Sequence, residues 1–250
     1  MKYAIALLLT CIIFPGCQPT KNNLEVFNLT CQYFPDPLGI DDESPELGWM
    51  IRSGSFGVTQ AAYRILVADD PGVLAKDSGN IWDSGKVMSN RSVQIRYGGA
   101  RLGPERKYYW KVRIWDQEGE PAWSETASWQ TGLLRPEDWS GARWIGFEEL
   151  PDSMRIVPGV HGAGNNLGEK GVKRPVIPFF REEFTLPKKI VSATLFISGL
   201  GQYEAYINGK KIGDAFLTPG WTDYDKTVFY NTWDVTPMLK KGANALGVIV

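Results

Sequence analysis

A short loop near the end of the chain gathers residues with binding chemistry. The segment Pro219–Asp225, PGWTDYD, contains Trp221, Asp223 and Tyr224. An aromatic ring offers a flat apolar face and a carboxylate accepts hydrogen bonds from hydroxyl groups, so the loop has the side chains needed to hold a sugar. A structural alternative is also open: Trp221 closes one end of a β-sandwich, while Thr222 and Asp223 order the turn.

His161 and the adjacent Glu182 and Glu183 do not form a catalytic set, and the sequence alone does not pair the remaining Asp and Glu residues across a sandwich. His161 is the single histidine of the chain, which excludes a zinc site with several His ligands. No nucleophile-elbow motif lies near it, so we expect a solvated loop histidine. Glu182 and Glu183 are adjacent on a predicted strand and therefore point to opposite faces, so they cannot act as a carboxylate pair.

Composition and charge exclude several classes of function. The chain has 250 residues, of which 43% are hydrophobic and 22% charged, as expected for one or two globular domains. Lys and Arg number 27 against 28 Asp and Glu, so no basic excess is available to neutralise a phosphate backbone. We therefore predict no nucleic-acid partner.

The N-terminus is a predicted targeting segment and plays no part in the fold. Lys2 precedes the apolar run Tyr3–Phe14, and Pro15-Gly16-Cys17 follows. A small residue before a Cys at the end of such a run resembles a bacterial lipoprotein signal. We expect residues 1–17 to be the signal, Cys17 to be lipidated and residues 18–23 to be a tether. The alternative is an ordinary secretory signal; either way we predict export, to the periplasm or outer membrane, with a lipid anchor as the membrane contact.

Residues 24–134 are predicted to form a β-sandwich, because short strands recur between turn signals. Alternation is clear in Ala62–Asp70 and again in Tyr108–Gly119. Leu102, Pro104 and Tyr108 match the Leu-x-Pro-x-x-x-Tyr pattern of fibronectin type III domains, in which the Tyr hydroxyl bonds to the backbone at a corner between strands. One helical turn is expected near residues 71–76.

Residues 135–178 are predicted to be a packed linker followed by a long irregular loop, and residues 179–250 to be a second β-domain. Its strands are expected in FFREEFTL, ATLFIS, QYEAYING, KKIGDAFL, TVFYNTWDV and ALGVIV, with Asn208-Gly209 as a hairpin turn. We interpret this domain as the opening of a galactose-binding-type jelly roll. The chain stops inside the apolar run ending at Val250, so we expect an incomplete domain and a longer parent.

Taken in order, these segments resemble the N-terminal half of bacterial α-L-rhamnosidases of glycoside hydrolase family 78. The matching segments are FPDPLGIDDESPELGWMI, AYRILVADD, IWDSGKV, YYWKVRIWDQEG, ARWIG and the block from Ala193 to Val250. The resemblance implies an all-β chain, a fibronectin III-like sandwich followed by an incomplete jelly roll. It also implies an (α/α)6 catalytic barrel beyond Val250, with no catalytic residue in 1–250.

The same resemblance sets expectations about activity and ligands. The parent would release terminal α-L-rhamnose from glycans or glycosides by an inverting mechanism with one acidic and one basic carboxylate. Some relatives bind rhamnose with calcium in the jelly roll, which makes Trp221, Asp223 and Tyr224 the candidate substrate-binding residues and calcium a candidate ion; no cofactor is expected to be required. Two alternatives stay open: a carbohydrate-binding surface lipoprotein without enzymatic activity, and a structural spacer.

Overall fold

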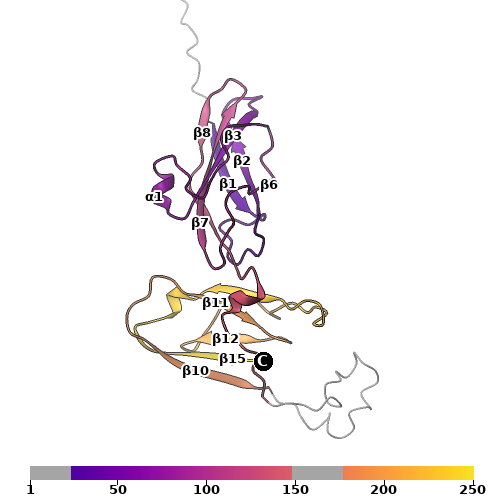
Figure 1. Ribbon diagram of the computed structural model, residues 1–250, viewed down its shortest axis with the longest axis vertical. Helices are drawn as coiled ribbons and strands as arrows, with labels where there is room; N and C mark the ends of the chain where they lie inside the picture. The colour runs from indigo at the N-terminus through magenta and orange to yellow at the C-terminus, as the bar shows by residue number, and fades with distance from the viewer. Residues whose placement is uncertain (1–23, 148–176) are drawn as a thin grey trace, which may run out of the picture.

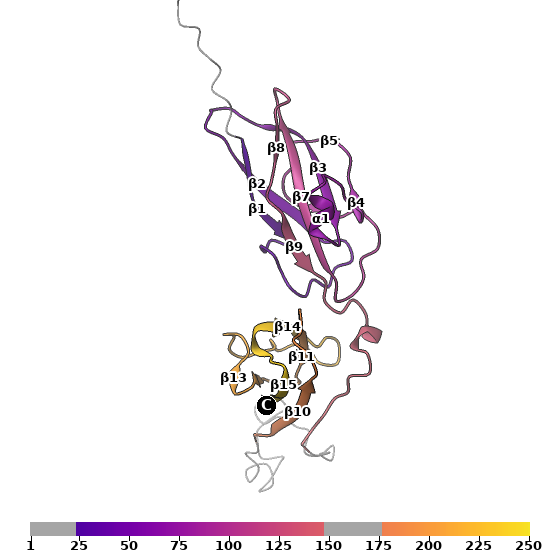
Figure 2. The same ribbon diagram turned by 90° about the vertical axis from the view of Figure 1, so that its left-hand side faces the viewer.

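The protein is an almost entirely β structure of two sandwiches, one above the other along the long axis (Figures 1 and 2). The computed structural model describes residues 24–147 and 177–250. The predicted signal, Cys17 and the tether lie outside these ranges, as do His161 and nearly all of the predicted loop. Within the described residues, no helix is long and apolar enough to cross a membrane.

The first sandwich packs a small sheet on a larger one. The small sheet has the order β1-β2-β6, and the larger one β4-β3-β7-β8, with β5 also on β3 and β9 on β7. The strands are β1 (Glu25–Cys31), β2 (Glu46–Arg52), β3 (Gln60–Ala68), β4 (Trp82–Asp83), β5 (Val87–Met88), β6 (Ile95–Arg96), β7 (Lys107–Asp116), β8 (Pro121–Trp123) and β9 (Ala127–Gln130).

Three tryptophans dominate the core between these sheets. Trp49, Trp110 and Trp129 are each at most 2% exposed. The indole N–H of Trp49 donates to Gln60 Oε1 at 2.9 Å, so this buried donor is satisfied. Along β7, alternate residues beginning with Tyr108 are buried, as the sequence pattern predicts.

The opposite face of β3 and β7 departs from expectation. Alternation alone predicts that Leu66 and Lys111 face solvent, but Leu66 is fully buried and Lys111 nearly so. Helix α1 (Pro71–Leu74), at the position predicted for a helical turn, places Leu74 against Leu66. Asp70 caps this helix by accepting from Gly72 N at 2.6 Å. A short connection therefore covers a face that the strand pattern leaves open.

The predicted corner between strands is present. The backbone N–H of Gly103 donates to the Tyr108 hydroxyl at 2.9 Å, five residues ahead in the chain. Tyr108 is buried and its ring packs on Trp129. Asp116 orders the turn after β7, because its Oδ1 accepts from the backbone N–H groups of Glu118 and Glu120.

The second sandwich has a four-stranded sheet of order β10-β15-β12-β13 and a two-stranded sheet of β11 and β14. Figure 1 shows β11 on the side next to the first sandwich and β10 on the far side. The strands are β10 (Phe179–Leu186), β11 (Thr194–Ser198), β12 (Glu204–Ile207), β13 (Lys210–Lys211), β14 (Tyr230–Asp234) and β15 (Gly242–Ile249), with a 3-10 turn, η4 (Thr236–Met238).

Two details of this domain test the sequence predictions. Asn208 and Gly209 both have positive φ, 52° and 80°, as the predicted hairpin between β12 and β13 requires. The strand predicted over KKIGDAFL is too long, because β13 ends at Lys211. Its continuation is an irregular loop, in which Ile212 is buried while Phe216 and Leu217 are exposed.

The two sandwiches meet through a joint made of specific contacts. The Tyr230 hydroxyl accepts from Leu133 N at 3.0 Å and donates to Leu133 O at 3.3 Å. Gln130 Nε2 donates to Thr194 Oγ1 at 3.0 Å. A Cβ on Gly132 would lie 2.3 Å from the Tyr230 hydroxyl, so only glycine permits this approach.

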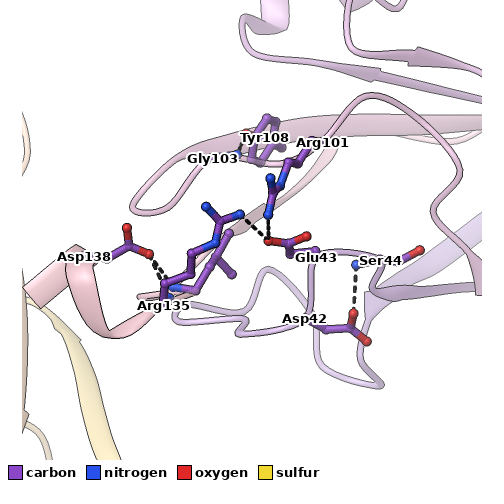
Figure 3. A network of polar contacts seen from close by, with 9 residues as sticks. Asp42, Glu43, Ser44, Arg101, Gly103, Tyr108, Arg135 and Asp138 are labelled. Carbon is purple, nitrogen blue, oxygen red and sulfur yellow. Dashed lines mark hydrogen bonds and ion pairs between the residues drawn. The ribbon is translucent and has the colours of Figure 1, made fainter.

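The linker that follows is tied to the first sandwich, as Figure 3 shows. Glu43 Oε1 accepts from Arg101 at 2.9 Å and from Arg135 at 3.0 Å. Asp138, in the 3-10 turn η1 (Pro136–Trp139), accepts from the backbone N–H of Arg135 at 2.9 Å. Trp139 packs edge-on against Tyr230, so the linker, the first sandwich and the second sandwich share one contact point.

Candidate functional site

The predicted binding loop lies in the long connection between β13 and β14. The backbone N–H of Tyr203, just before β12, donates to Thr218 O at 2.8 Å and fixes one end of the loop. At the other end, Ser198 Oγ of β11 donates to Phe229 O at 2.7 Å. The loop is therefore anchored to both sheets of the second domain.

Asp223 organises the turn within this loop. Its backbone oxygen accepts from the N–H groups of Lys226 and Thr227, both at 2.9 Å. Its carboxylate pairs with Lys226 Nζ at 2.8 Å, and the Thr222 hydroxyl donates to Thr227 O. The turn-ordering role predicted for Thr222 and Asp223 is confirmed.

Trp221 does not close the end of the sandwich. Its side chain is 74% exposed, so the structural alternative for this residue is wrong within the described chain. Tyr224 is 37% exposed, and three further apolar side chains of the same connection, Phe216, Leu217 and Phe229, are also exposed. The loop presents an apolar, aromatic surface in which Trp221 is free to contact a ligand.

The described residues do not bring metal ligands together. They contain no group of three or more His, Cys, Asp or Glu side chains arranged to hold an ion. Calcium takes about six to eight oxygen ligands, and Asp223 is already paired with Lys226. We therefore assign no calcium-dependent step to these residues, and the binding of calcium by this domain stays a prediction.

A second polar cluster, to which the sequence analysis assigned no role, lies on β12 and β13. Glu204 accepts from Lys211 Nζ at 2.7 Å and from the Tyr206 hydroxyl. The hydrogen bond from Lys211, followed by that from Tyr206, lowers the pKa of Glu204. The bond to Glu204 in turn raises the pKa of Tyr206. Alternation along the strand predicts that Glu204 and Tyr206 lie on one face of β12. Only the pairing of β12 with β13 shows that Lys211 lies beside them.

Fold and sequence together define the class of protein. An immunoglobulin-type domain model, described as Rha78A-like and N-terminal, matches residues 26–135. An α-L-rhamnosidase N-terminal domain model matches residues 188–250. The predicted fibronectin type III character of the first sandwich is a finer assignment than this match and stays a prediction.

The proteins to which the chain is similar are named α-L-rhamnosidases. An α-L-rhamnosidase of Formosa agariphila is 33% identical over 253 residues, which covers 100% of this chain and 27% of that protein. The solved α-L-rhamnosidase from Dictyoglumus thermophilum superposes with a TM-score of 0.77 at 36% identity, covering 90% of this chain and 25% of that one. That of Streptomyces avermitilis, solved with L-rhamnose, gives a TM-score of 0.73 at 25% identity, over 91% of this chain and 36% of that one.

In both of its sandwiches the chain matches an N-terminal part of α-L-rhamnosidases of glycoside hydrolase family 78. It spans between 22% and 36% of the length of the curated relatives that it matches. The predicted family and all-β fold are confirmed.

Proposed function

We propose that this chain forms non-catalytic β-domains of an exported α-L-rhamnosidase that removes terminal α-L-rhamnose from glycans or glycosides. The observation that carries the proposal is the match of both sandwiches, in order, to relatives and solved structures of that name. Glu182 and Glu183 are adjacent on β10 and lie on opposite faces of its sheet, so they do not form a carboxylate pair. Both matched domain models are N-terminal ones, which supports placing catalysis in a further part of the parent protein.

The expected chemistry is an inverting hydrolysis. A protonated carboxylic acid would donate to the leaving oxygen while an ionised carboxylate would activate water on the opposite face of the sugar, at a separation of roughly 6.5–9.5 Å. The β-domains would contribute a firm support, because the Tyr230 hydroxyl joins the two sandwiches at Leu133 and the Glu43–Arg135 pair holds the linker on the first sandwich. The loop with Trp221, Asp223 and Tyr224 would contact the substrate by stacking and hydrogen bonding.

The decisive test is hydrolysis of p-nitrophenyl α-L-rhamnopyranoside by the complete product of the reading frame. We expect release of nitrophenol, with β-L-rhamnose as the first anomer detected by proton NMR. If the α anomer appeared first, the inverting mechanism would be contradicted, but the rhamnosidase activity would stand. Absence of hydrolysis in a folded protein would favour the non-enzymatic alternatives.

Export and anchoring need a separate test. We propose that Cys17 carries the lipid, because the sequence Pro15-Gly16-Cys17 follows the apolar run of the signal. Membrane fractionation should find the wild type in the membrane and Cys17→Ser released or unprocessed. Equal membrane binding of both proteins, with Cys17→Ser processed to the same length as the wild type, would contradict a lipid anchor at this residue.

A carbohydrate-binding lipoprotein without enzymatic activity is the second candidate, favoured by the exposed ring of Trp221. Titration of the full chain with L-rhamnose, with and without calcium, should change tryptophan fluorescence in the wild type but less in Trp221→Phe. Phe keeps an apolar ring, so Trp221→Ala should lose more of the binding. An unchanged signal in all three proteins would remove the loop as a sugar site.

A further inference from the structure

The first sandwich contains an open polar hollow of about 440 Å³, at the point where β2 begins and β6 ends. Figure 1 shows these two strands side by side. None of the residues around the hollow belongs to the joint or to the Trp221 loop. They include three charged side chains and an amide, which suits a polar ligand: Glu46, Tyr63, Arg91, Gln94, Ile95 and Arg96.

The loop that leads into β6 forms one wall of the hollow, and buried groups hold its backbone. Gln60, which is 5% exposed, donates from Nε2 to Ser89 O at 3.1 Å and to Arg91 O at 2.8 Å. The backbone N–H of Trp49 donates to Ser92 O at 2.8 Å. The backbone at Arg91 is therefore already ordered, so a ligand would not lose affinity to the cost of ordering this loop.

A chain of hydrogen bonds joins the polar side chains of the wall. Arg91 Nη2 donates to Gln94 O at 3.0 Å, and Gln94 Nε2 donates to the Tyr33 hydroxyl at 2.9 Å. That hydroxyl in turn donates to Glu46 Oε2 at 3.0 Å. The chain positions a guanidinium group and a carboxylate at the same hollow.

The two arginines of the hollow lack close carboxylate partners, unlike others in this domain. Arg52 and Arg64 each have a carboxylate oxygen at 2.5 Å. Arg96 Nη2 lies 3.6 Å from Glu46 Oε1, which is too long for a hydrogen bond. Arg91 forms no ion pair within the part of the chain that the structure describes. Two guanidinium groups and one carboxylate give the hollow a formal charge of +1, which favours a ligand with one negative charge.

The floor of the hollow offers one more donor. Tyr63 lines the hollow and is only 8% exposed, with its ring packed edge-on against Trp49 at 5.3 Å between ring centroids. In residues 24–147 and 177–250 its hydroxyl has no hydrogen-bond partner. Buried polar groups are normally hydrogen-bonded, so an acceptor placed in the hollow would satisfy this hydroxyl.

We propose that this hollow of the first sandwich binds a carboxylate whose body carries hydroxyl groups. Arg91 and Arg96 bind the carboxylate, because the planar fork of a guanidinium group matches its two oxygens. The Tyr63 hydroxyl donates to the same ligand, and Glu46 accepts from one of its hydroxyl groups. The volume lies within the roughly 300–1,000 Å³ of small-molecule sites. Two sources share this chemistry: a uronate unit of a glycan and a free hydroxy acid.

The test is an NMR titration of the nitrogen-15-labelled full chain with three probes. Methyl β-D-glucuronide represents a uronate in a glycan, D-gluconate a free hydroxy acid, and methyl β-D-glucoside a neutral sugar of similar size. We expect the acids to shift the backbone amide signals of Arg91, Gln94 and Arg96. The neutral glucoside should bind about tenfold more weakly, since it lacks the charged group that the guanidinium groups recognise. The acid that binds more tightly identifies the source.

Arg96→Gln should weaken the binding of the acids about tenfold, through loss of a charged hydrogen bond. Arg52→Gln is the matched control, because the Arg52 side chain is 63% exposed against 65% for Arg96, lies outside the hollow and carries the same charge. It should leave the affinity unchanged. Tyr63→Phe keeps the proposal testable if Arg96→Gln folds poorly. It should weaken binding severalfold without lowering the melting temperature, since the hydroxyl bonds to none of the described residues.

Four results overturn the proposal. The first is a folded protein whose amide signals at the hollow respond to neither acid. The second is a neutral glucoside that binds as tightly as the acids. The third is an equal loss of affinity in Arg96→Gln and Arg52→Gln, which would assign the binding to net charge alone. The last is an affinity that neither Arg96→Gln nor Tyr63→Phe changes.

This inference goes beyond the proposed function, because neither rhamnose nor hydrolysis enters its test. If the complete gene product hydrolyses the nitrophenyl rhamnoside while the full chain binds neither acid, only the carboxylate site is wrong. If an acid binds at the hollow while the gene product hydrolyses nothing, the site stands and the enzyme assignment falls.

Discussion

The two sandwiches of this protein differ in how completely they bury their own apolar residues. The core of the first contains 17 buried residues, including Trp49, Trp110 and Trp129. The core of the second contains five. Every residue of β11 is only partly buried, and the same holds for most of β15. The first domain is closed by two full sheets, whereas the second sets only two strands against four.

This difference in buried residues indicates where each domain obtains its stability. The hydrophobic contribution is roughly 25 cal/mol for each Å² of apolar surface removed from water, so a domain with few buried residues gains little from its own core. The second domain therefore depends more on the joint at Tyr230 and on any surface that covers its exposed side chains.

Removing one tryptophan should destabilise the first sandwich severely. Trp110→Ala deletes a fully buried ring and should lower the free energy of unfolding by about 3–5 kcal/mol. Chemical denaturation followed by circular dichroism would measure it. Trp115→Ala is the control on the same strand, because Trp115 faces outward under Lys86 and Arg113 and should cost much less. Equal losses in both variants would contradict the idea that this core sets the stability of the domain.

A comparison of the first domain alone with both domains together should show that the second domain is less soluble and less stable. A protein of residues 24–134 should melt cooperatively and stay soluble, whereas one of residues 18–250 should be less soluble and melt in two steps. The physical reason is the apolar surface on the second domain, including Phe216, Leu217 and Trp221. Calorimetry and light scattering would measure both properties. A single high-temperature transition in a monomeric 18–250 protein would remove the contrast.

Breaking the joint should uncouple the two sandwiches at a smaller cost. Tyr230→Phe leaves the N–H of Leu133, a 7% exposed residue, without its acceptor, which costs about 1–3 kcal/mol. The two unfolding transitions should move apart. Tyr33→Phe is the control, since its hydroxyl is exposed and bonded at the surface to Glu46. A joint of no energetic importance would give the same small change in both variants.

Alkaline pH should loosen the same joint, with the smallest effect. Burial raises the pKa of Tyr230 above 10, aided by Asp41 and Asp138, although the bond to Leu133 opposes it. Because the folded-state pKa is the higher one, stabilisation is complete below the unfolded pKa of 10 and is lost as pH rises through the folded value. The difference in stability between wild type and Tyr230→Phe should shrink above pH 10. A constant difference would show that folding does not raise the pKa of Tyr230.

Local patterns predicted most of the first domain. The alternation in β7 predicted an inward face of Tyr108, Trp110, Val112 and Ile114, which are all buried. The pattern of Leu102, Pro104 and Tyr108 predicted a bond between the Tyr108 hydroxyl and the backbone, and the structure identifies Gly103 as its partner. They failed where a tertiary neighbour changed the environment, as at Leu66, which α1 covers. They also failed at residues 213–217, where an alternating pattern has no partner strand and forms a loop.

The candidate site shows the same division. The sequence identified the composition of the Trp221 loop and the turn made by Asp223, because both depend on neighbours in the chain. It could not decide that Trp221 would be exposed, which depends on the packing of distant strands.

The sequence alone predicted the resemblance to the family and most of the strands with their inward faces, since periodicity and turn residues act over a few positions. Only the tertiary structure decided which strands became neighbours. Register brought Arg181, Gly247 and Tyr206 from three separated strands into one row. It also placed Tyr230 against Leu133, 97 residues away. Such pairs arise from long-range sheet pairing, whose outcome depends on the packing of the whole domain and not on any short segment.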